Sequence, residues 1–516
     1  MNKQQLVRSF AVSAATVLGL LLSASIASAQ AISSDGFPGS VPKAICGPGD
    51  HTESGLQGQT TPLERSSGDS VRAYNCNLQL VGQYQGEGNY SQDGPAYAGS
   101  CAYVATDRVT ALQQHLGIMV VDASDPQHPT PTAYLNDTPA AQNPHETLKH
   151  NDRRNLLAVS LTNGSNFAVY DTSVDCRHPV LRGSIDLPGN SAHMGNFTPD
   201  GLTYYIGQSF EGIGGFVQIV DLADPSNPKQ LPAWQYMGDG RPHGIWFNAD
   251  GTRMYAGQAG MYGNVGNTAF GTGPDGLVIE DVSDYQFRRP NPQIRIISTL
   301  FWNDQGTVEE MYPFTSNGRQ YVVSSDESGG AGGVGGILLA CVRRASAFGY
   351  PNIIDITDEA NPRIVAKLML EVNDPNHCKP LVYDPPDVGG ATPAYNEERC
   401  VTDRPNNPTM LACAFQYAGL RVFDIRDLSN PKEIAYYKPG AMRTAFLPGS
   451  SIWTATADRT VDRLAGYPRF FPRVTASGTQ MEIWVVSADN GFQILRFSDQ
   501  FQSANRDLFE QALRND

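Results

Sequence analysis

A short phrase recurs six times along this chain and limits the folds open to it. Each copy has an apolar, β-branched run, then an Asp, then a polar turn that closes on Pro, and a second strand-like run follows. The six Asp residues are Asp122, Asp171, Asp221, Asp281, Asp355 and Asp424. Their spacing, roughly 50 to 75 residues, is the period of propeller blades with loop insertions. We expect each Asp to accept hydrogen bonds from turn amides.

The two ends of the chain carry complementary halves of a seventh repeat. Residues 76–85 look like the strand that follows each Pro, although no repeat phrase precedes them, and the segment 481–497 lacks that strand. Pairing them would close the ring and remove its open edges. The sequence therefore predicts an all-β, seven-bladed β-propeller closed by an N-terminal strand, with loop insertions at 260–276, 326–349 and 372–408.

The remaining segments flank this propeller, which we place at 76–500. Residues 1–29 read as a signal peptide, because Lys3 and Arg8 precede an apolar run and Ala27-Ser28-Ala29 is a small-residue cleavage site. Residues 30–75 are rich in Ser, Gly and Pro and are predicted to be an irregular tail. Residues 501–516 are predicted to form a short C-terminal helix. We expect a periplasmic or secreted protein with no membrane span after signal removal.

Composition excludes one class of partner. The formal net charge is −15, and nucleic-acid binding needs a basic face. Eight cysteines in an exported chain permit four disulfides. Cys46–Cys76 is a candidate pair, and Cys378–Cys400 is another because the two bracket one insertion. A thiolate metal site is disfavoured because the chain has no CxxC pair.

The repeat phrase resembles a known family. MVVDASDPQHP, VQIVDLADPSNP, IIDITDEANP and RVFDIRDLSNP are similar to the segments that name the LVIVD-repeat β-propellers, which are exported bacterial and archaeal proteins. The resemblance covers about residues 80–500. It implies the propeller fold, and it implies no particular activity.

A second register, in the hairpin ahead of each phrase, carries the chemistry. His193 and His243 each stand four residues before an aromatic residue and eight before a turn Gly. The same spacing, counted back from Phe314 and Gly318, selects Glu310 in the next blade. Counting back from other turns selects His145 and Glu398. Equivalent positions on a closed ring converge on its axis, so these five residues are predicted to share one channel-facing cluster.

Imidazoles and carboxylates facing one cavity are a ligand set for Zn, Cu, Fe or Mn. We therefore predict a divalent transition metal held by His145, His193, His243, Glu310 and Glu398. Glu309, Glu397 and Arg443 adjoin these positions and are candidates for acid–base or second-layer roles. Aromatic residues of the channel-mouth loops could line an apolar pocket above the cluster or pack the loops onto the blades. They are Tyr262, Phe270, Trp302, Phe348, Tyr350, Tyr395, Tyr467, Phe470 and Phe471.

Two classes of function remain open at this stage. One is a metal-dependent enzyme that acts on a small-molecule substrate in the central channel. The other is a non-catalytic propeller that binds a protein or polysaccharide partner, with the histidines ordering the inner strands. No GxSxG elbow or Walker loop supports a different chemistry.

Overall fold

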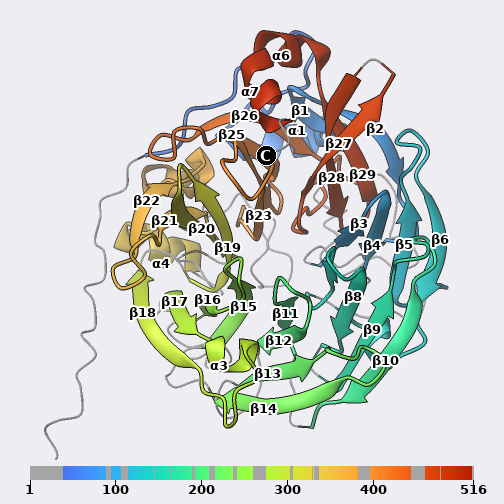
Figure 1. The fold of residues 1–516 in the computed structure, drawn as a ribbon. Helices are drawn as coiled ribbons and strands as arrows, with labels where there is room; N and C mark the ends of the chain where they lie inside the picture. Colours follow the sequence, from blue (N-terminus) through green and yellow to red (C-terminus); the bar gives the residue numbers. More distant parts are fainter. Residues whose placement is uncertain are drawn as a thin grey trace, which may run out of the picture.

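Seven antiparallel sheets surround a central axis in the computed structural model (Figure 1). In blades 1 to 5 the first strand in chain order lies innermost. The structure describes residues 39–88, 94–105, 114–144, 146–162, 164–188, 192–207, 216–235, 241–259, 275–302, 306–327, 329, 336–381, 395–442, 460–476 and 478–513. The seven-bladed propeller expected from the repeats is confirmed.

Blades 1 to 3 are regular four-stranded sheets. Their strands are β3 (Ala96–Ala98), β4 (Cys101–Val104), β5 (Ile118–Asp122) and β6 (Thr130–Leu135); β7 (Lys149–Asn151), β8 (Leu156–Ser160), β9 (Asn166–Asp171) and β10 (Val180–Asp186); β11 (Met194–Phe197), β12 (Thr203–Gly207), β13 (Phe216–Asp221) and β14 (Lys229–Gln235).

Blades 4 to 6 continue the pattern, and blade 6 gains a fifth strand. Their strands are β15 (Arg241–Phe247), β16 (Arg253–Ala259), β17 (Asp275–Asp281) and β18 (Arg295–Trp302); β19 (Val308–Ser316), β20 (Arg319–Asp326), β21 (Asn352–Asp355) and β22 (Arg363–Lys367); β23 (Arg399–Thr402), β24 (Met410–Phe415), β25 (Gly419–Asp424) and β26 (Lys432–Lys438), with β1 (Tyr74–Cys76) outside β26.

Blade 7 closes the ring with strands from both ends of the chain. β27 (Arg469–Thr475), β28 (Gly478–Ser487) and β29 (Gly491–Phe497) are completed by β2 (Leu78–Tyr84). β2 pairs with β29 in antiparallel register from Leu78↔Phe497 to Tyr84↔Phe492. The predicted closure by residues 76–85 beside 481–497 is confirmed.

The repeat Asp residues stabilise the turns, as expected. In every copy one carboxylate oxygen accepts the backbone N–H two residues ahead, for example from Ser124 N to Asp122 at 2.8 Å and from Ala223 N to Asp221 at 3.1 Å. The same bond occurs at Asp171, Asp281, Asp355 and Asp424. Each Asp thus orders the turn between the third and fourth strands of its blade.

The turns also join neighbouring blades. Gly82, at a bulge in β2, lies so close to the turn of blade 1 that a Cβ there would meet the Pro126 carbonyl oxygen at 2.1 Å. In blade 4, Ser298 Oγ donates to the carbonyl of Glu359 in the turn of blade 5. The strand after each Pro therefore receives the turn of the next blade.

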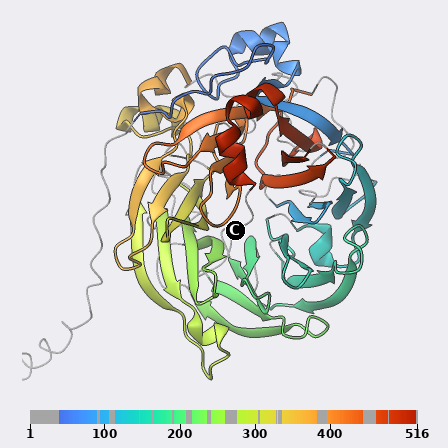
Figure 2. The ribbon, with the colours of Figure 1, turned by 45° about the horizontal axis from the view of Figure 1, so that its top comes forward.

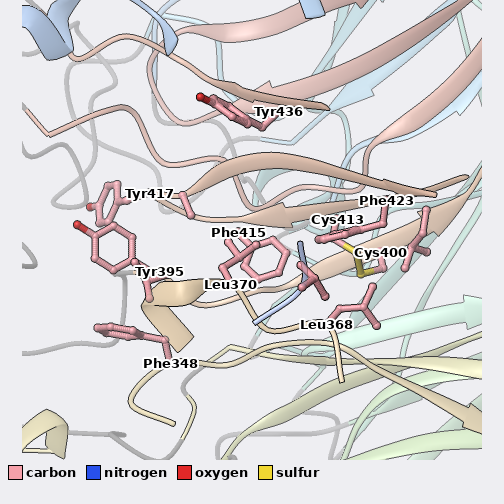
Figure 3. Close-up of a cluster of buried hydrophobic side chains, with 14 of the residues drawn as sticks. Phe348, Leu368, Leu370, Tyr395, Cys400, Cys413, Phe415, Tyr417, Phe423 and Tyr436 are labelled. Carbon is pink, nitrogen blue, oxygen red and sulfur yellow. A yellow bond between two sulfur atoms is a disulfide. The ribbon is translucent and has the colours of Figure 1, made fainter. Parts of the chain in front are cut away.

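The largest group of buried apolar side chains spans blades 5 and 6 and the segment before β1 (Figure 3). Figure 3 shows Leu370, which follows β22, beside Phe415 of β24. Residues 39–73, expected to be irregular, include the helix α1 (Pro62–Ser67) and the 3₁₀ turn η1 (Asp69–Val71). Figure 2 shows this blue segment on the outside of the ring.

All eight cysteines are paired, but not all as expected. Cys46–Cys76 and Cys101–Cys176 form, and the other bonds are Cys341–Cys378 and Cys400–Cys413. The Cys378–Cys400 pairing was wrong. Cys400 lies directly opposite Cys413 in the β23–β24 ladder, whereas Cys378 packs against a helix of the preceding insertion. Loop length in the sequence does not reveal either contact.

The helices occupy insertions and the C-terminus. They are α2 (Pro139–Gln142), α3 (Ser283–Gln286), α4 (Gly336–Arg343), η4 (Glu371–Asn373), η5 (Pro375–His377), α5 (Cys378–Leu381), α6 (Asp499–Ala504) and α7 (Arg506–Ala512). Two insertions expected as loops thus carry helical turns, and the expected C-terminal helix is two helices meeting at Asn505. Among the described residues, no helix has the length and apolar character needed to cross a membrane.

Candidate metal centre in the central channel

The innermost strands of blades 4 and 5 each contain a β-bulge facing the axis. In β15, His243 and Gly244 together oppose one residue of β16, between the pairs Pro242↔Gln258 and Ile245↔Ala256. In β19, Glu309 and Glu310 do the same against β20. A bulge adds a residue and re-aims the side chains around it. Residues three apart, such as His243 and Trp246, can therefore both reach the channel.

Two histidines and a glutamate meet at this point. His193 Nε2 lies 3.4 Å from Glu146 Oε2, and His243 Nε2 lies 3.7 Å from the same oxygen. The two imidazole ring centroids are 4.7 Å apart. All three residues are buried, and His243 is 0% exposed. Blades 2, 3 and 4 thus deliver one ligand atom each to a shared position.

A second carboxylate and a guanidinium complete this group. Glu309 Oε1 lies 3.5 Å from His243 Nε2. Arg399, the first residue of β23, pairs through Nη1 with Glu309 and through Nη2 with Glu146 Oε2 at 3.0 Å. Arg399 is 0% exposed. The guanidinium therefore fixes the two carboxylates that flank the imidazoles, and we call Glu146, His193, His243, Glu309 and Arg399 the axial cluster.

Burial sets the protonation of these groups. Desolvation, reinforced by His193, lowers the pKa of His243 to about 3, so its imidazole is neutral at physiological pH. Desolvation raises the pKa of the Glu309 carboxyl well above its usual range despite Arg399. Burial opposes the charge of Arg399, but Glu309 and Glu146 outweigh it and raise the pKa of the guanidinium. The cluster holds neutral imidazole beside acids that no neighbouring cation fully compensates.

Carboxyl groups outnumber basic groups in the buried channel. Within the described residues the buried acids here are Glu146, Glu309, Glu310, Glu397 and Glu398, and the buried bases are Arg399, Arg463 and Lys149. Desolvation also lowers the pKa of Lys149 to about 7, which weakens its contribution. Because burying an uncompensated carboxylate is costly, some of these carboxyls hold a proton instead. A bound divalent cation would let them ionise.

Glu310 belongs to a neighbouring group rather than to the imidazoles. Its Oε2 accepts hydrogen bonds from Trp246 Nε1 at 2.6 Å and from the Tyr467 hydroxyl. Lys149 places its Nζ 3.6 Å from the Tyr467 ring centroid and 5.8 Å from that of Trp246. Gly244 makes room for this arrangement, since a Cβ there would lie 2.8 Å from Glu310 Cβ.

Of the other predicted site residues, Glu397 and Glu398 contact groups other than the imidazoles of His193 and His243. Glu398 contacts Arg463 and Gln416 through Oε1. Glu397 accepts from Ser325 Oγ at 3.2 Å, and desolvation raises its pKa well above the usual range. His145 and Arg443 lie outside the described residues. Of the predicted ligands, His193 and His243 come together, while Glu310 and Glu398 each contact other partners.

Unequal hairpins explain the residues that the sequence register missed. The sequence prediction counted eight residues back from a turn residue of each hairpin. The residue after the one paired with the repeat Asp faces Phe197, Phe247 and Pro313 across the hairpins of blades 3, 4 and 5, and six, six and eight residues separate these pairs. Four residues before these positions stand His193, His243 and Glu309, so Glu309 and not Glu310 is the equivalent residue in blade 5. In blade 2 the same step leads from His150 to Glu146.

The donor set of the axial cluster fits a transition metal. Two ligands held 2.0–2.1 Å from one zinc ion at the tetrahedral angle are about 3.3 Å apart, close to the 3.4 and 3.7 Å spacings around Glu146 Oε2. Glu309 Oε1 makes no hydrogen bond in the described part of the chain. Arg399 would orient Glu146 from behind, as outer-layer partners of metal ligands do. The Cys-containing acidic groups do not compete, because their cysteines are disulfide-bonded.

A cavity of about 700 Å³ lies where the hairpin turns of blades 2 to 6 meet. Its lining includes Asn196, Trp246, Tyr312 and Phe314. The Trp246 and Tyr312 rings touch edge to face with centroids 4.8 Å apart. Because Trp246 also donates to Glu310, this aromatic pair lies between the cavity and the buried charges.

No protein-family model matches the chain, and no curated protein matches it. Solved structures that it is similar to include hydrazine synthase of Kuenenia stuttgartiensis, at 12% identity and TM-score 0.45, covering 81% of this chain and 96% of that one. Another is the periplasmic gluconolactonase PpgL of Pseudomonas aeruginosa, at 12% identity and TM-score 0.44, covering 82% and 94%. A third is the β-propeller domain of Myceliophteria thermophila Cps50 (Swd1), at 10% identity and TM-score 0.47, covering 82% and 99%. At such identities these likenesses concern the fold alone.

Proposed function

We propose that this protein is an exported LVIVD-type β-propeller that binds one divalent transition-metal ion in its central channel and acts as a metal-dependent enzyme on a small substrate. The observation that carries the proposal is the convergence of His193 Nε2 and His243 Nε2 on one buried carboxylate oxygen of Glu146, at 3.4 and 3.7 Å. Neutral imidazole and carboxylate suit Zn, Cu, Fe and Mn alike.

The residues around the ligands support catalysis as well as binding. Three protein ligands leave positions open, which distinguishes catalytic from structural zinc sites. An ion held there would supply Lewis acidity towards a substrate oxygen. Glu309, beside His243 and with a raised pKa, is suited to hold a proton and pass it to substrate. Arg399 keeps Glu146 and Glu309 in place.

The family and the compartment are proposed on independent grounds. Six copies of the Asp-turn-Pro phrase support membership of the LVIVD-repeat propellers. Four disulfides and no free cysteine among the described residues are typical of an oxidising compartment. With the signal-like residues 1–29, they support a periplasmic or secreted location.

Metal analysis of the purified protein tests the proposal. We expect about one transition-metal ion per chain, lost in His193→Ala and His243→Ala but kept in His128→Ala, whose imidazole is exposed on a turn. X-ray absorption of the zinc form should show nitrogen ligands at about 2.0–2.1 Å. Absence of bound metal from well-folded wild-type protein, after incubation with each of the four metals, would leave the non-catalytic binding module as the better description.

A further inference from the structure

Beside the axial cluster lies a pair of oppositely charged groups that the metal proposal does not use. Lys149, on β7, is 8% exposed, and its Nζ makes no hydrogen bond in the described part of the chain. Glu310, on β19, is 0% exposed, and its Oε1 likewise makes none there. An ammonium has three N–H donors and a carboxylate oxygen is a strong acceptor. Leaving both unsatisfied in a buried site costs stability.

The surroundings hold these two groups apart. Glu310 Oε2 is fixed by Trp246 and Tyr467, which leaves Oε1 as the oxygen free to accept from a ligand. The Lys149 ammonium rests over the Tyr467 ring, 3.6 Å from its centroid, in a cation–π contact. The donor on Lys149 and the acceptor on Glu310 thus both contact the Tyr467 and Trp246 side chains, one through the rings and the other through their polar groups. Such a pair is complementary to a ligand that carries both an anionic group and a hydrogen-bond donor.

The charges nearby restrict the anion. Glu146 and Glu309 also act electrostatically on Lys149, so a dianion such as a phosphate ester would be repelled, whereas a singly charged carboxylate is tolerated. The position of Lys149 restricts the size of the ligand. Lys149 stands three residues after Glu146, and Glu146 and Glu309 act electrostatically on its ammonium, so it lies close to the axial cluster. A molecule of a few carbon atoms would reach from Lys149 towards the imidazoles.

We propose that Lys149 and Glu310 form the recognition end of the substrate site, and that the substrate is a small organic acid with a hydroxyl group next to its carboxylate. The carboxylate pairs with Lys149 Nζ, and the hydroxyl donates to Glu310 Oε1. This inference deepens the proposed function. The ligand is a substrate only if the protein is the proposed enzyme, but the binding of the ligand itself requires no metal.

Trp246 provides the readout, because its ring lies 5.8 Å from Lys149 Nζ and its indole donates to Glu310. We would titrate metal-free protein with L-lactate, lactamide and propionate and follow tryptophan fluorescence, with Trp246→Phe identifying the responding residue. L-lactate should change the signal with saturation, and lactamide should not. Lys149→Met should weaken L-lactate binding ~10- to 100-fold, the range for hydrogen bonds to a charged group, and Lys149→Arg should retain part of it.

Two further variants sharpen the test. Glu310→Gln should reduce the preference for L-lactate over propionate, since the acceptor at Oε1 is then weakened. Lys229→Met, at an exposed position on β14, should bind L-lactate as the wild type does. Circular dichroism and thermal melting identify variants that fail to fold, and in that event the wild-type preference for L-lactate over lactamide decides the matter.

The results separate this inference from the metal proposal. Three results would overturn the recognition site even if the protein binds metal. They are equal binding of lactamide and L-lactate, no binding of either compound, and wild-type affinity for L-lactate in folded Lys149→Met. Conversely, Lys149-dependent binding of L-lactate by a protein that takes up no metal would support the recognition site and refute the metal-dependent chemistry.

Discussion

Replacing Arg399 by Met tests the charge balance of the channel most directly. Its Nη2 lies 3.0 Å from Glu146 Oε2 and its Nη1 contacts Glu309, all in a buried setting. At an effective dielectric constant of about 20, one unit-charge pair at this separation attracts by ~5 kcal/mol before desolvation is counted. Removing one partner of a buried ion pair costs ~3–5 kcal/mol, because the remaining charge is uncompensated.

We therefore expect metal-free Arg399→Met to lose ~3–5 kcal/mol of unfolding free energy. A divalent cation should replace much of the missing positive charge. Zinc at one hundred times its dissociation constant stabilises any protein that binds it only when folded by about 2.7 kcal/mol. At a fixed zinc concentration the variant should gain more than the wild type, since its carboxylates have lost their competing cation.

Guanidinium chloride unfolding of both proteins, with EDTA and with zinc, measures these differences. Arg469→Met is the matched control, because the Arg469 guanidinium stacks on Tyr97 and Trp484 and has no carboxylate partner among the described residues. Its response to zinc should equal that of the wild type. The reasoning is wrong if metal-free Arg399→Met is as stable as the wild type, or if zinc stabilises both proteins equally.

Four other predictions concern the fold. Asp221→Ala should lower the unfolding free energy by ~1 kcal/mol and Asp221→Asn by less, since Asn keeps the acceptor for the turn amide; equal losses in denaturant melts would contradict the turn role. Gly82→Ala should destabilise ring closure by several kcal/mol, because the new methyl group meets a backbone carbonyl of blade 1; an unchanged melting curve would show that the blades separate freely. Replacing Cys101 and Cys176 by Ser should cost ~4–5 kcal/mol from loop entropy over their separation of 75 residues, and reduction-insensitive stability of the wild type would argue against it. The pKa of Asp403 is raised to about 6, chiefly by desolvation, so its folded form binds protons more tightly than its unfolded form and stability falls as pH rises from about 4 to 6; Asp403→Asn should therefore match the wild type at pH 4 and exceed it at pH 7 by at most ~3 kcal/mol, and a pH-independent difference would refute the assignment.

Parts of the candidate site were predictable because they depend on the repeat alone. His193 and His243 occur in hairpins of the same length, Phe197↔Tyr204 and Phe247↔Met254. The spacing from histidine to turn glycine is therefore the same in those two blades, and the structure places their imidazole ring centroids 4.7 Å apart.

The prediction from this spacing failed where the hairpin changes length. Asn317 and Gly318 both have positive φ, as a two-residue hairpin turn requires, and this shifts the equivalent position by one residue to Glu309. The Asn-Gly pair was visible in the sequence and could have signalled the shift. Arg399 gave no such signal, because its role depends on two carboxylates from blades 2 and 5 that approach it only in the closed ring.

The sequence by itself determined the seven-bladed ring, the closure by residues 76–85 and the role of the repeat Asp residues. These features rest on local patterns that recur within each blade: alternating strands, a turn amide for each carboxylate, and one missing half-repeat at each end. The tertiary structure alone decided which side chains meet at the axis, which cysteines pair and where buried charge is unbalanced. Those outcomes depend on bulges and turn lengths that displace side chains by one residue, and on contacts between blades that lie far apart in the chain.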